Sequence, residues 1–147
     1  MFSPKKILVP TDYSTFSDKA LTQALDIARQ HEAKLYLLHV VGLVQQCVVD
    51  YCMDNATVAD LDKKAVESAK EMMAEQIKRT GDTKGVEIIS DVRKGTPYEE
   101  ILNEEKAQKI DLIVIASHGK TGLVSYLMGS VAEKVSRGAK GPVLLVR

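Results

Sequence analysis

Short apolar runs alternate along this chain with longer stretches in which apolar residues recur at helical spacing. Four runs are continuously apolar, as is typical of buried parallel strands, at residues 7–9, 35–41, 112–116 and 143–146. Residues 86–91 alternate apolar and polar positions, which suits a strand near a sheet edge. Helical spacing falls at residues 20–28, 59–77, 97–108 and 130–137. This alternation predicts an α/β fold, a doubly wound, five-stranded parallel sheet with helices on both faces in a three-layer sandwich.

Capping signals mark where two of the helices begin. Ser14 or Ser17 is expected to cap the first helix, because a hydroxyl there can accept a hydrogen bond from the first turn. Thr96 carries two start signals for the third helix, Pro97 at the first helical position and Glu99 three residues after the threonine.

The other two helices carry predictions about burial and helix ends. Ser130 with Glu133 has the pattern of a capping box at the start of the fourth helix, and Gly138 is expected to cap its C-terminus. The second helix is amphipathic, and its predicted apolar stripe comprises Leu61, Ala65, Ala69, Met72 and Ile77.

Composition and charge narrow the class of protein. The 147 residues suit one domain, residues 1–147, and 45% apolar with 27% charged residues is ordinary for a globular protein. Lys plus Arg (20) equals Asp plus Glu (20), so no basic surplus would attract nucleic acid or an anionic membrane. No run approaches the length of a membrane span, and the N-terminus passes directly into a strand instead of a signal peptide. We therefore expect a cytoplasmic protein that binds no nucleic acid and does not insert into membranes.

Two cysteines, Cys47 and Cys52, stand close together in a stretch without regular pattern. Without a secretory signal they read as reduced thiols. With Asp50 and Asp54 nearby they could also bind a soft metal, although two thiols at this spacing are a weak signal.

A glycine-rich loop follows the apolar strand 112–116 and leads to a helix start at Gly129-Ser130. A strand, a glycine loop and a helix N-terminus together present bare backbone N–H groups to an anion, usually a phosphate. The loop is no P-loop, because the glycine required before Gly119-Lys120 is replaced by Val114. The opening strand and turn contain no glycine, which excludes the dinucleotide fingerprint. The loop therefore predicts a phosphate site of another kind.

Four separated motifs resemble the universal stress protein family. Ala116-Ser117-His118-Gly119, nine residues and then Gly129-Ser130 is similar to that family's signature of G-x2-G-x9-G-[S/T]. The opening ILVPTDYS, the LHV of the second strand, Gly95-Thr96-Pro97 and the closing GPVLLV also resemble its motifs, in the same order. The resemblance spans the whole chain.

The resemblance implies the strand order 3-2-1-4-5, a homodimer, and ATP or AMP bound across the first and fourth strands. It implies that the adenine and ribose face Pro10, Thr11, Asp12 and Val40. The phosphate path would be lined by Ala116, Gly119, Gly129, Ser130 and Val131. Ala116 departs from the signature, because it stands where that family has its first glycine. Its methyl group could crowd a nucleotide, or it is tolerated if the residue stays extended at the strand end.

Several of these residues have a second interpretation. Asp12 could cap the next helix instead of binding ribose, and the Ser130 hydroxyl could serve its own helix. We expect His118 to be hydrogen-bonded to backbone and His39 to be a satisfied core histidine. Lys120 could neutralise phosphate or simply solubilise the loop.

The sequence thus predicts an adenine-nucleotide-binding stress-response or signalling module. It would act as a homodimer through strand Val143–Val146 and through an unknown signalling partner. The alternative is a structural or interaction dimer of the same fold with no nucleotide. An enzyme is not expected beyond a slow ATPase, since no base is poised for water and no acidic pair could hold a metal. Any Mg²⁺ would be held mainly by phosphate oxygens and water.

Overall fold

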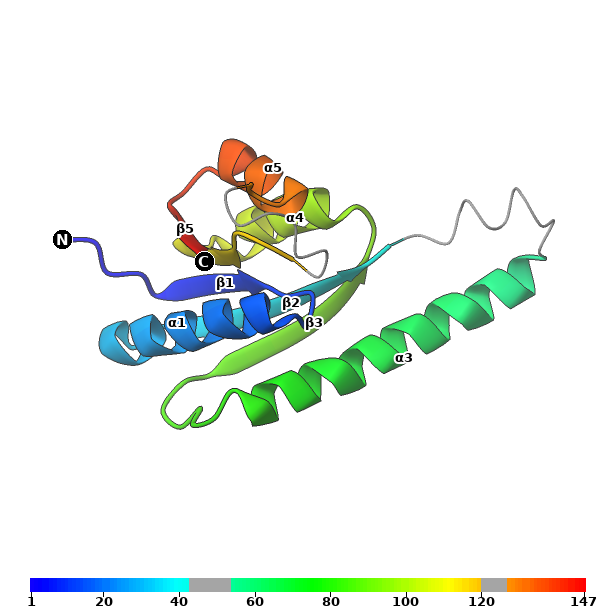
Figure 1. Cartoon of the computed structure of the whole chain (residues 1–147), viewed down its shortest axis with the longest axis horizontal. Coiled ribbons are helices and arrows are strands. Elements are labelled where there is room, and N and C mark those ends of the chain that lie inside the picture. Colours follow the sequence, from blue (N-terminus) through cyan, green and yellow to red (C-terminus); the bar gives the residue numbers. More distant parts are fainter. Residues whose placement is uncertain (43–53, 120–126) are drawn as a thin grey trace.

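The computed structural model describes residues 1–42, 54–119 and 127–147. Its five strands form one parallel sheet in the order β3-β2-β1-β4-β5, which confirms the predicted fold and strand order (Figure 1). The strands are β1 Lys6–Pro10, β2 Lys34–Val41, β3 Ile88–Lys94, β4 Leu112–Ala116 and β5 Val143–Val146. The helices in the described ranges are α1 Thr15–His31, α3 Asn55–Arg79, α4 Pro97–Gln108 and α5 Ser130–Gly138.

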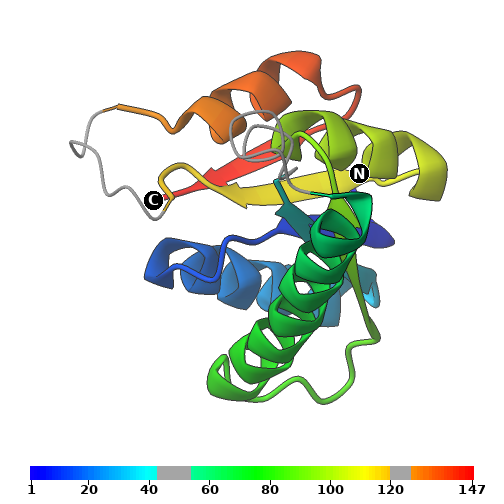
Figure 2. The same cartoon turned by 90° about the vertical axis from the view of Figure 1, so that its right-hand side faces the viewer.

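Helices cover both faces of the sheet, with α1 and α3 on one side and α4 and α5 on the other (Figure 2). Alternate strand residues point to opposite faces, so each strand feeds two separate apolar clusters. In β1, Ile7 and Val9 pack with α1, whereas Leu8 packs toward α4 and α5. The core is therefore two layers of side chains divided by the sheet.

The middle of the sheet is β1, which pairs in register with β2 on one side and β4 on the other. Ile7 lies opposite Leu35 of β2 and Leu112 of β4. Residues 112–115 of β4 are buried, as the continuous apolar run predicted. The two outer strands, β3 and β5, contain more exposed positions, in agreement with their places at the sheet edges.

Of the two serines predicted to cap α1, Ser14 is the N-cap, and its side chain accepts a hydrogen bond from Ser17 N at 3.2 Å. Pro97 occupies the first turn of α4 as predicted, but Thr96 makes no side-chain capping bond. Glu99 instead accepts a hydrogen bond from the Tyr98 hydroxyl at 3.1 Å. The local pattern therefore located this helix start correctly and its capping bond wrongly.

The predicted apolar stripe of α3 is partly wrong. Leu61 and Met72 are 37% and 39% exposed, whereas Met73 and Gln76 are buried. The helix is 25 residues long, and its first turns extend past the end of β3 (Figure 1). Only its C-terminal half packs on the sheet, and the buried face of that half consists of Ala69, Met73 and Gln76.

The predicted ends of α5 also need correction. The N-cap is Gly129, with Ser130 the first helical residue, so the capping box does not form. Gly138 belongs to the helix, and the C-cap is Ala139 in extended conformation. Gly138 packs closely against α4, since a Cβ there would lie 2.6 Å from Leu102 Cδ1 and the leucine side chain would have to shift.

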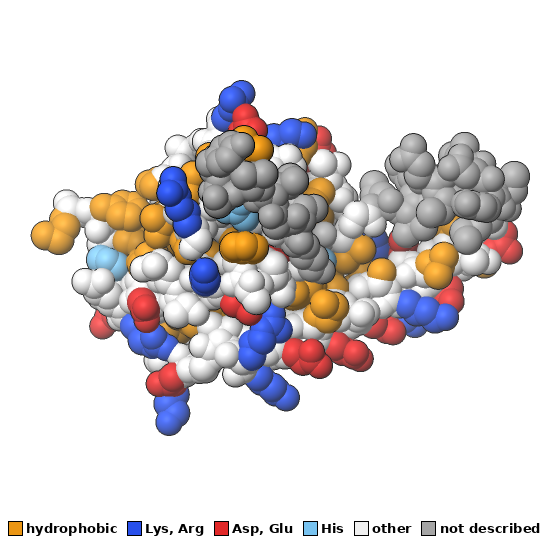
Figure 3. All heavy atoms as spheres, viewed as in Figure 1, with side chains coloured by type: hydrophobic (Ala, Val, Ile, Leu, Met, Phe, Trp, Pro, Cys, Tyr) orange, Lys and Arg blue, Asp and Glu red, His pale blue; other side chains and the backbone are white. Residues whose placement is uncertain are grey.

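Charges of both signs are interspersed over α1 and α3 on the described part of the face shown in Figure 3. Across the described ranges, no helix combines the length and apolar character that crossing a membrane requires.

Candidate functional site

A cavity of about 330 Å³ opens at the carboxyl ends of β1, β2 and β4, beside the first turns of α4 and α5. Ligands of open α/β sheets bind at such a position, where the helices that follow two neighbouring strands leave on opposite faces. Eight of the nine residues that the sequence assigned to a site line this cavity: Pro10, Thr11, Asp12, Val40, Ala116, Gly119, Ser130 and Val131.

The first wall is the turn between β1 and α1. Thr11 N donates to Leu38 O at 2.8 Å, which ties the turn to β2. Asp12 Oδ1 accepts hydrogen bonds from Ser14 N (3.0 Å) and Ser14 Oγ (2.5 Å). The interpretation of Asp12 as the cap of the next helix is therefore wrong, because Ser14 caps α1 and Asp12 orients Ser14. The second carboxylate oxygen of Asp12 is directed toward Gly119.

The second wall is the loop that leaves β4. Ala116 is still in the strand, opposite Val146 of β5, so its methyl group causes no backbone strain, as expected. Gly129 N donates to Ser117 O at 2.7 Å, which brings the start of α5 back onto the loop. A Cβ on Gly129 would lie 3.4 Å from Ser117 O and 4.0 Å from Gly119 N. Gly129, the ninth predicted residue, thus supports the cavity from behind its lining.

The start of α5 is suited to an anion. The N-cap, Gly129, has no side chain with which to cap the first turn, so the capping box expected of Ser130 and Glu133 does not form. Ser130 and Val131 both line the cavity. Uncapped N–H groups and the positive end of the helix dipole favour a negative group there. Glu133 is paired with Arg137 at 2.9 Å, which reduces its repulsion of such a group.

Two histidines line the cavity. His39 Nδ1 lies 2.7 Å from Thr11 O and its ring is 4.4 Å from that of Tyr13, so the histidine is hydrogen-bonded as expected, but it is half-buried at the cavity and does not lie in the core. His118 is bonded through Nδ1 to Ser117 Oγ at 2.9 Å, so the expected bond to backbone is replaced by one to a side chain. The buried Nε2 of His118 has no hydrogen-bond partner among the described residues.

Sequence reasoning missed the apolar side of the cavity. Pro97 and Ile101 of α4 and Ala132 of α5 belong to this lining, together with Leu38 and Ile115 of the sheet. The start of α4 was a possible signal, because that helix follows β3 and begins at the same edge of the sheet as the cavity. Apolar periodicity, however, does not show which turn of a helix faces a cavity.

Within the described ranges, no three or more His, Cys, Asp or Glu residues are grouped to hold a metal ion. The predicted thiols Cys47 and Cys52, and Lys120 of the glycine loop, lie outside the described residues.

The topology and the cavity define an open α/β domain with a cavity at the switch point between β1 and β4. The sequence model of the Universal stress protein family matches residues 4–147, and the chain belongs to that family. Universal stress protein MJ0531 of Methanocaldococcus jannaschii is 34% identical over 143 residues, which cover 97% of this chain and 82% of that protein.

Solved structures share the fold. The structure of MJ0577, described as a structure-based assignment of biochemical function, has a TM-score of 0.84 and 32% identity, and the match covers 99% of this chain and 96% of that one. Two others resemble this chain in fold alone. One is a universal stress protein in complex with cAMP (TM-score 0.71, 22% identity, 99% of this chain and 98% of that one). The other, from Archaeoglobus fulgidus, is in complex with dAMP (TM-score 0.61, 18% identity, 99% and 100%).

Proposed function

We propose that this protein binds an adenine nucleotide, ATP or AMP, in the cavity between β1 and β4 and acts as a stress-response or signalling module. The observation that carries the proposal is the convergence of signature residues from β1, β2, β4 and α5 on one cavity. The complexes of the same fold with cAMP and dAMP support an adenine ligand.

The cavity offers suitable chemistry for each part of the ligand. Apolar side chains (Val40, Pro97, Ile101) would cover the adenine ring, and the Asp12 carboxylate would accept hydrogen bonds from the ribose hydroxyls. The phosphates would lie against the uncapped start of α5. A Cβ on Gly129 would make an ordinary contact with Ser117 O at 3.4 Å, whereas a larger, branched side chain would crowd a phosphate in this cradle.

We propose binding and signalling rather than catalysis, with slow ATP hydrolysis at most. Mg²⁺ bound with ATP would be coordinated mainly by phosphate oxygens and water, since the described part of the cavity offers Asp12 as its one carboxylate. Signalling would then pass through a protein partner that recognises the loaded or the empty form.

We also propose a homodimer through β5. Leu144 is 36% exposed on this edge strand, and the outer edge of β5 has no strand beside it within the sheet. An apolar edge strand is a template for pairing with a second copy, and a two-fold arrangement closes without polymerising. The second candidate function, an interaction dimer with an empty site, depends on the same edge.

Nucleotide released from the purified, heat-denatured protein should be identified by mass spectrometry, and binding of AMP and ATP measured by titration calorimetry. We expect micromolar or weaker affinity. Gly129→Val should abolish binding because its branched side chain would enter the space between Gly129 and the Ser117–Gly119 backbone. It should cost about 1 kcal/mol of stability, the scale of a poor N-cap.

Gly129→Ala is the matched control. Its Cβ would meet Ser117 O at 3.4 Å, an ordinary contact, so the fold should be unchanged and most of the affinity retained. A parent protein that releases no nucleotide and gives neither heat nor a thermal shift with AMP or ATP would favour the empty-site alternative.

A further inference from the structure

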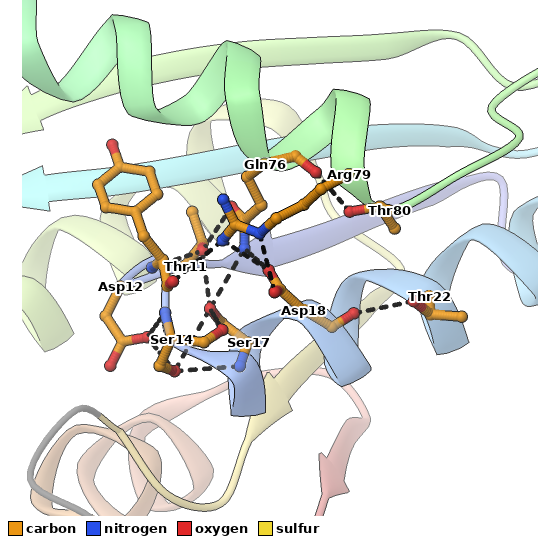
Figure 4. A network of polar contacts seen from close by, with 10 residues as sticks. Thr11, Asp12, Ser14, Ser17, Asp18, Thr22, Gln76, Arg79 and Thr80 are labelled. Carbon is orange, nitrogen blue, oxygen red and sulfur yellow. Dashed lines mark hydrogen bonds and ion pairs between the residues drawn. The ribbon is translucent and has the colours of Figure 1, made fainter.

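The turn that carries Asp12 rests on α3 through hydrogen bonds of Thr11 and Tyr13 (Figure 4). We propose that Gln76 and Arg79 of α3 are positioning residues for the nucleotide site, which hold this turn so that Asp12 faces the ligand. The inference rests on the proposed function. Neither residue lines the cavity, so their effect on binding would be indirect.

Gln76 joins both arms of the turn. Its side chain is fully buried, and Thr11 Oγ1 donates to Gln76 Oε1 at 2.8 Å. Gln76 Nε2 donates to Asp18 Oδ1 at 2.8 Å and lies 3.3 Å from Ser17 Oγ. One amide therefore connects the residue before Asp12 to the first turn of α1.

Arg79 binds the backbone carbonyl of Tyr13, the residue that follows Asp12. Its Nη2 donates to Tyr13 O at 3.0 Å, and Nε and Nη2 together grip the Asp18 carboxylate at 3.0 and 2.9 Å. A guanidinium that binds a carboxylate through two nitrogens has a fixed direction. The Tyr13 carbonyl is thereby fixed relative to α1.

Tyr13 needs such support because its backbone is in the left-handed region, with φ 65°, which is unusual for a bulky residue. Its N–H donates to Thr11 Oγ1 at 3.1 Å, the same oxygen that Gln76 binds. Its hydroxyl donates to the Ala69 carbonyl of α3 at 2.7 Å. Both ends of Tyr13 thus depend on α3.

The link to Asp12 is short. Asp12 lies between Thr11 and Tyr13, and its Oδ1 is fixed by Ser14, whose Oγ also accepts from Ser17 N. Figure 4 shows the Asp12 carboxylate pointing away from Gln76 and Arg79. Loss of the Gln76 amide would remove one hydrogen bond from Thr11 and one from Ser17, leaving the turn held by Thr11 Oγ1 to Ser17 Oγ at 3.0 Å and by the backbone bond to β2.

A purely structural role does not explain this choice of side chain. Met73, one turn earlier on the same buried face of α3, packs into the apolar cluster with no polar group. The hydrogen bonds of the Gln76 amide go to Thr11 and to the first turn of α1. A satisfied polar network of this kind specifies one arrangement of the groups it joins.

The test compares Gln76→Leu with Met73→Ala, a control that loosens the same helix without touching the turn. Calorimetry with AMP should give a Kd about tenfold higher for Gln76→Leu, the scale of one misplaced charged hydrogen bond. The control should bind within about twofold of the parent even where it loses as much thermal stability. Arg79→Met, at a partly exposed side chain, should weaken AMP binding in the same direction if Gln76→Leu does not fold.

A double-mutant cycle separates positioning from general damage. In an Asp12→Ala background, Gln76→Leu should change the Kd for AMP by less than about twofold, because the group that it positions is gone. An unchanged Kd for Gln76→Leu alone, or effects that multiply in the double variant, would overturn the proposal.

Amide hydrogen exchange of the ligand-free protein gives a second readout. Gln76→Leu should accelerate exchange of the Tyr13 and Ser14 amides about tenfold or more, and Met73→Ala should not. If the parent protein fails to bind AMP, the proposed function fails, while exchange still decides whether Gln76 holds the turn. Equal exchange in the parent and in Gln76→Leu would reject the inference.

Discussion

Gly119→Ala tests the geometry of the cavity more closely than any other single change. Gly119 does not occupy the left-handed region, so its backbone accepts alanine. The new Cβ would lie 2.7 Å from Asp12 Oδ2, about 0.7 Å closer than an ordinary contact at 3.4 Å. The carboxylate of Asp12 would have to move, while the rest of the loop would not.

The size of the effect follows from how Asp12 is held. Asp12 Oδ1 is bonded to Ser14 N and Ser14 Oγ. If the carboxylate moves away from the new methyl group, it can strain its side-chain torsion, which costs ~0.5–1.5 kcal/mol. Otherwise it weakens a hydrogen bond to a charged group, which costs ~1.5–3 kcal/mol. The smaller cost decides, and the free energy of unfolding should fall by about 1 kcal/mol. Affinity for AMP should fall about ten- to hundredfold, since a charged hydrogen bond to the ribose would be misplaced.

Calorimetry with AMP and denaturant unfolding measure the two quantities, with Gly141→Ala as the control. A Cβ on Gly141 would have its nearest neighbour at 3.7 Å, an ordinary contact. In an Asp12→Ala background the stability loss of Gly119→Ala should vanish, because both described atoms near the added methyl belong to the Asp12 carboxylate. A Gly119→Ala protein that binds AMP like the parent would refute the assignment of Asp12 to the ligand.

Three further predictions concern other parts of the molecule. Ala116→Gly should tighten AMP binding by up to ~1–2 kcal/mol, because it removes a methyl group that would crowd the nucleotide. Glycine in a strand should also lower the free energy of unfolding by about 0.5–1 kcal/mol. An unchanged Kd in calorimetry would mean that the methyl group is accommodated. Replacing Leu144 and Val146 together by lysine should convert the dimer to a monomer in light scattering, and a monomeric parent at micromolar concentration would contradict the proposed interface. Burial raises the pKa of Tyr13 to about 12, so the unfolded state, with its tyrosine near pKa ~10, loses the proton first. The free energy of unfolding should therefore be constant below about pH 10 and fall by about 1 kcal/mol up to about pH 12, after allowance for solvent screening; Tyr13→Phe should remove this slope in denaturant titrations.

The sequence predicted the four continuously apolar strands well, because such a run has few alternatives in an α/β domain. The alternating pattern placed the remaining strand at residues 86–91, whereas β3 spans Ile88–Lys94. The sequence predicted the burial on α3 poorly, for two physical reasons. The helix outruns the sheet, so periodicity in its first turns does not report packing, as the exposure of Leu61 shows. Gln76 is polar and fully buried, and its partners lie 59 and 65 residues away in Ser17 and Thr11, where no local pattern could indicate them.

The candidate site was predictable mainly through the spacing of the glycine loop. The resemblance supplied the residues that line the cavity, whereas local rules misjudged Ser130, which resembles a capping box in sequence. The N-cap is Gly129 instead of Ser130, and its N–H is bonded to Ser117 O, a contact between the two ends of the loop. Capping rules consider neighbours in sequence and omit such contacts.

The central position of β1 has a consequence for folding during synthesis. Strand β1 can pair with β2 once residues 34–38 have been synthesised. Its other edge has no partner until Leu112 and Ile113 of β4 have also been synthesised. During most of translation, Ile7 and Leu8 therefore lie on an apolar strand with one edge open to other chains. Late, long-range closure of this kind slows folding and exposes a template for aggregation, so the nascent chain should depend on chaperones until β4 emerges.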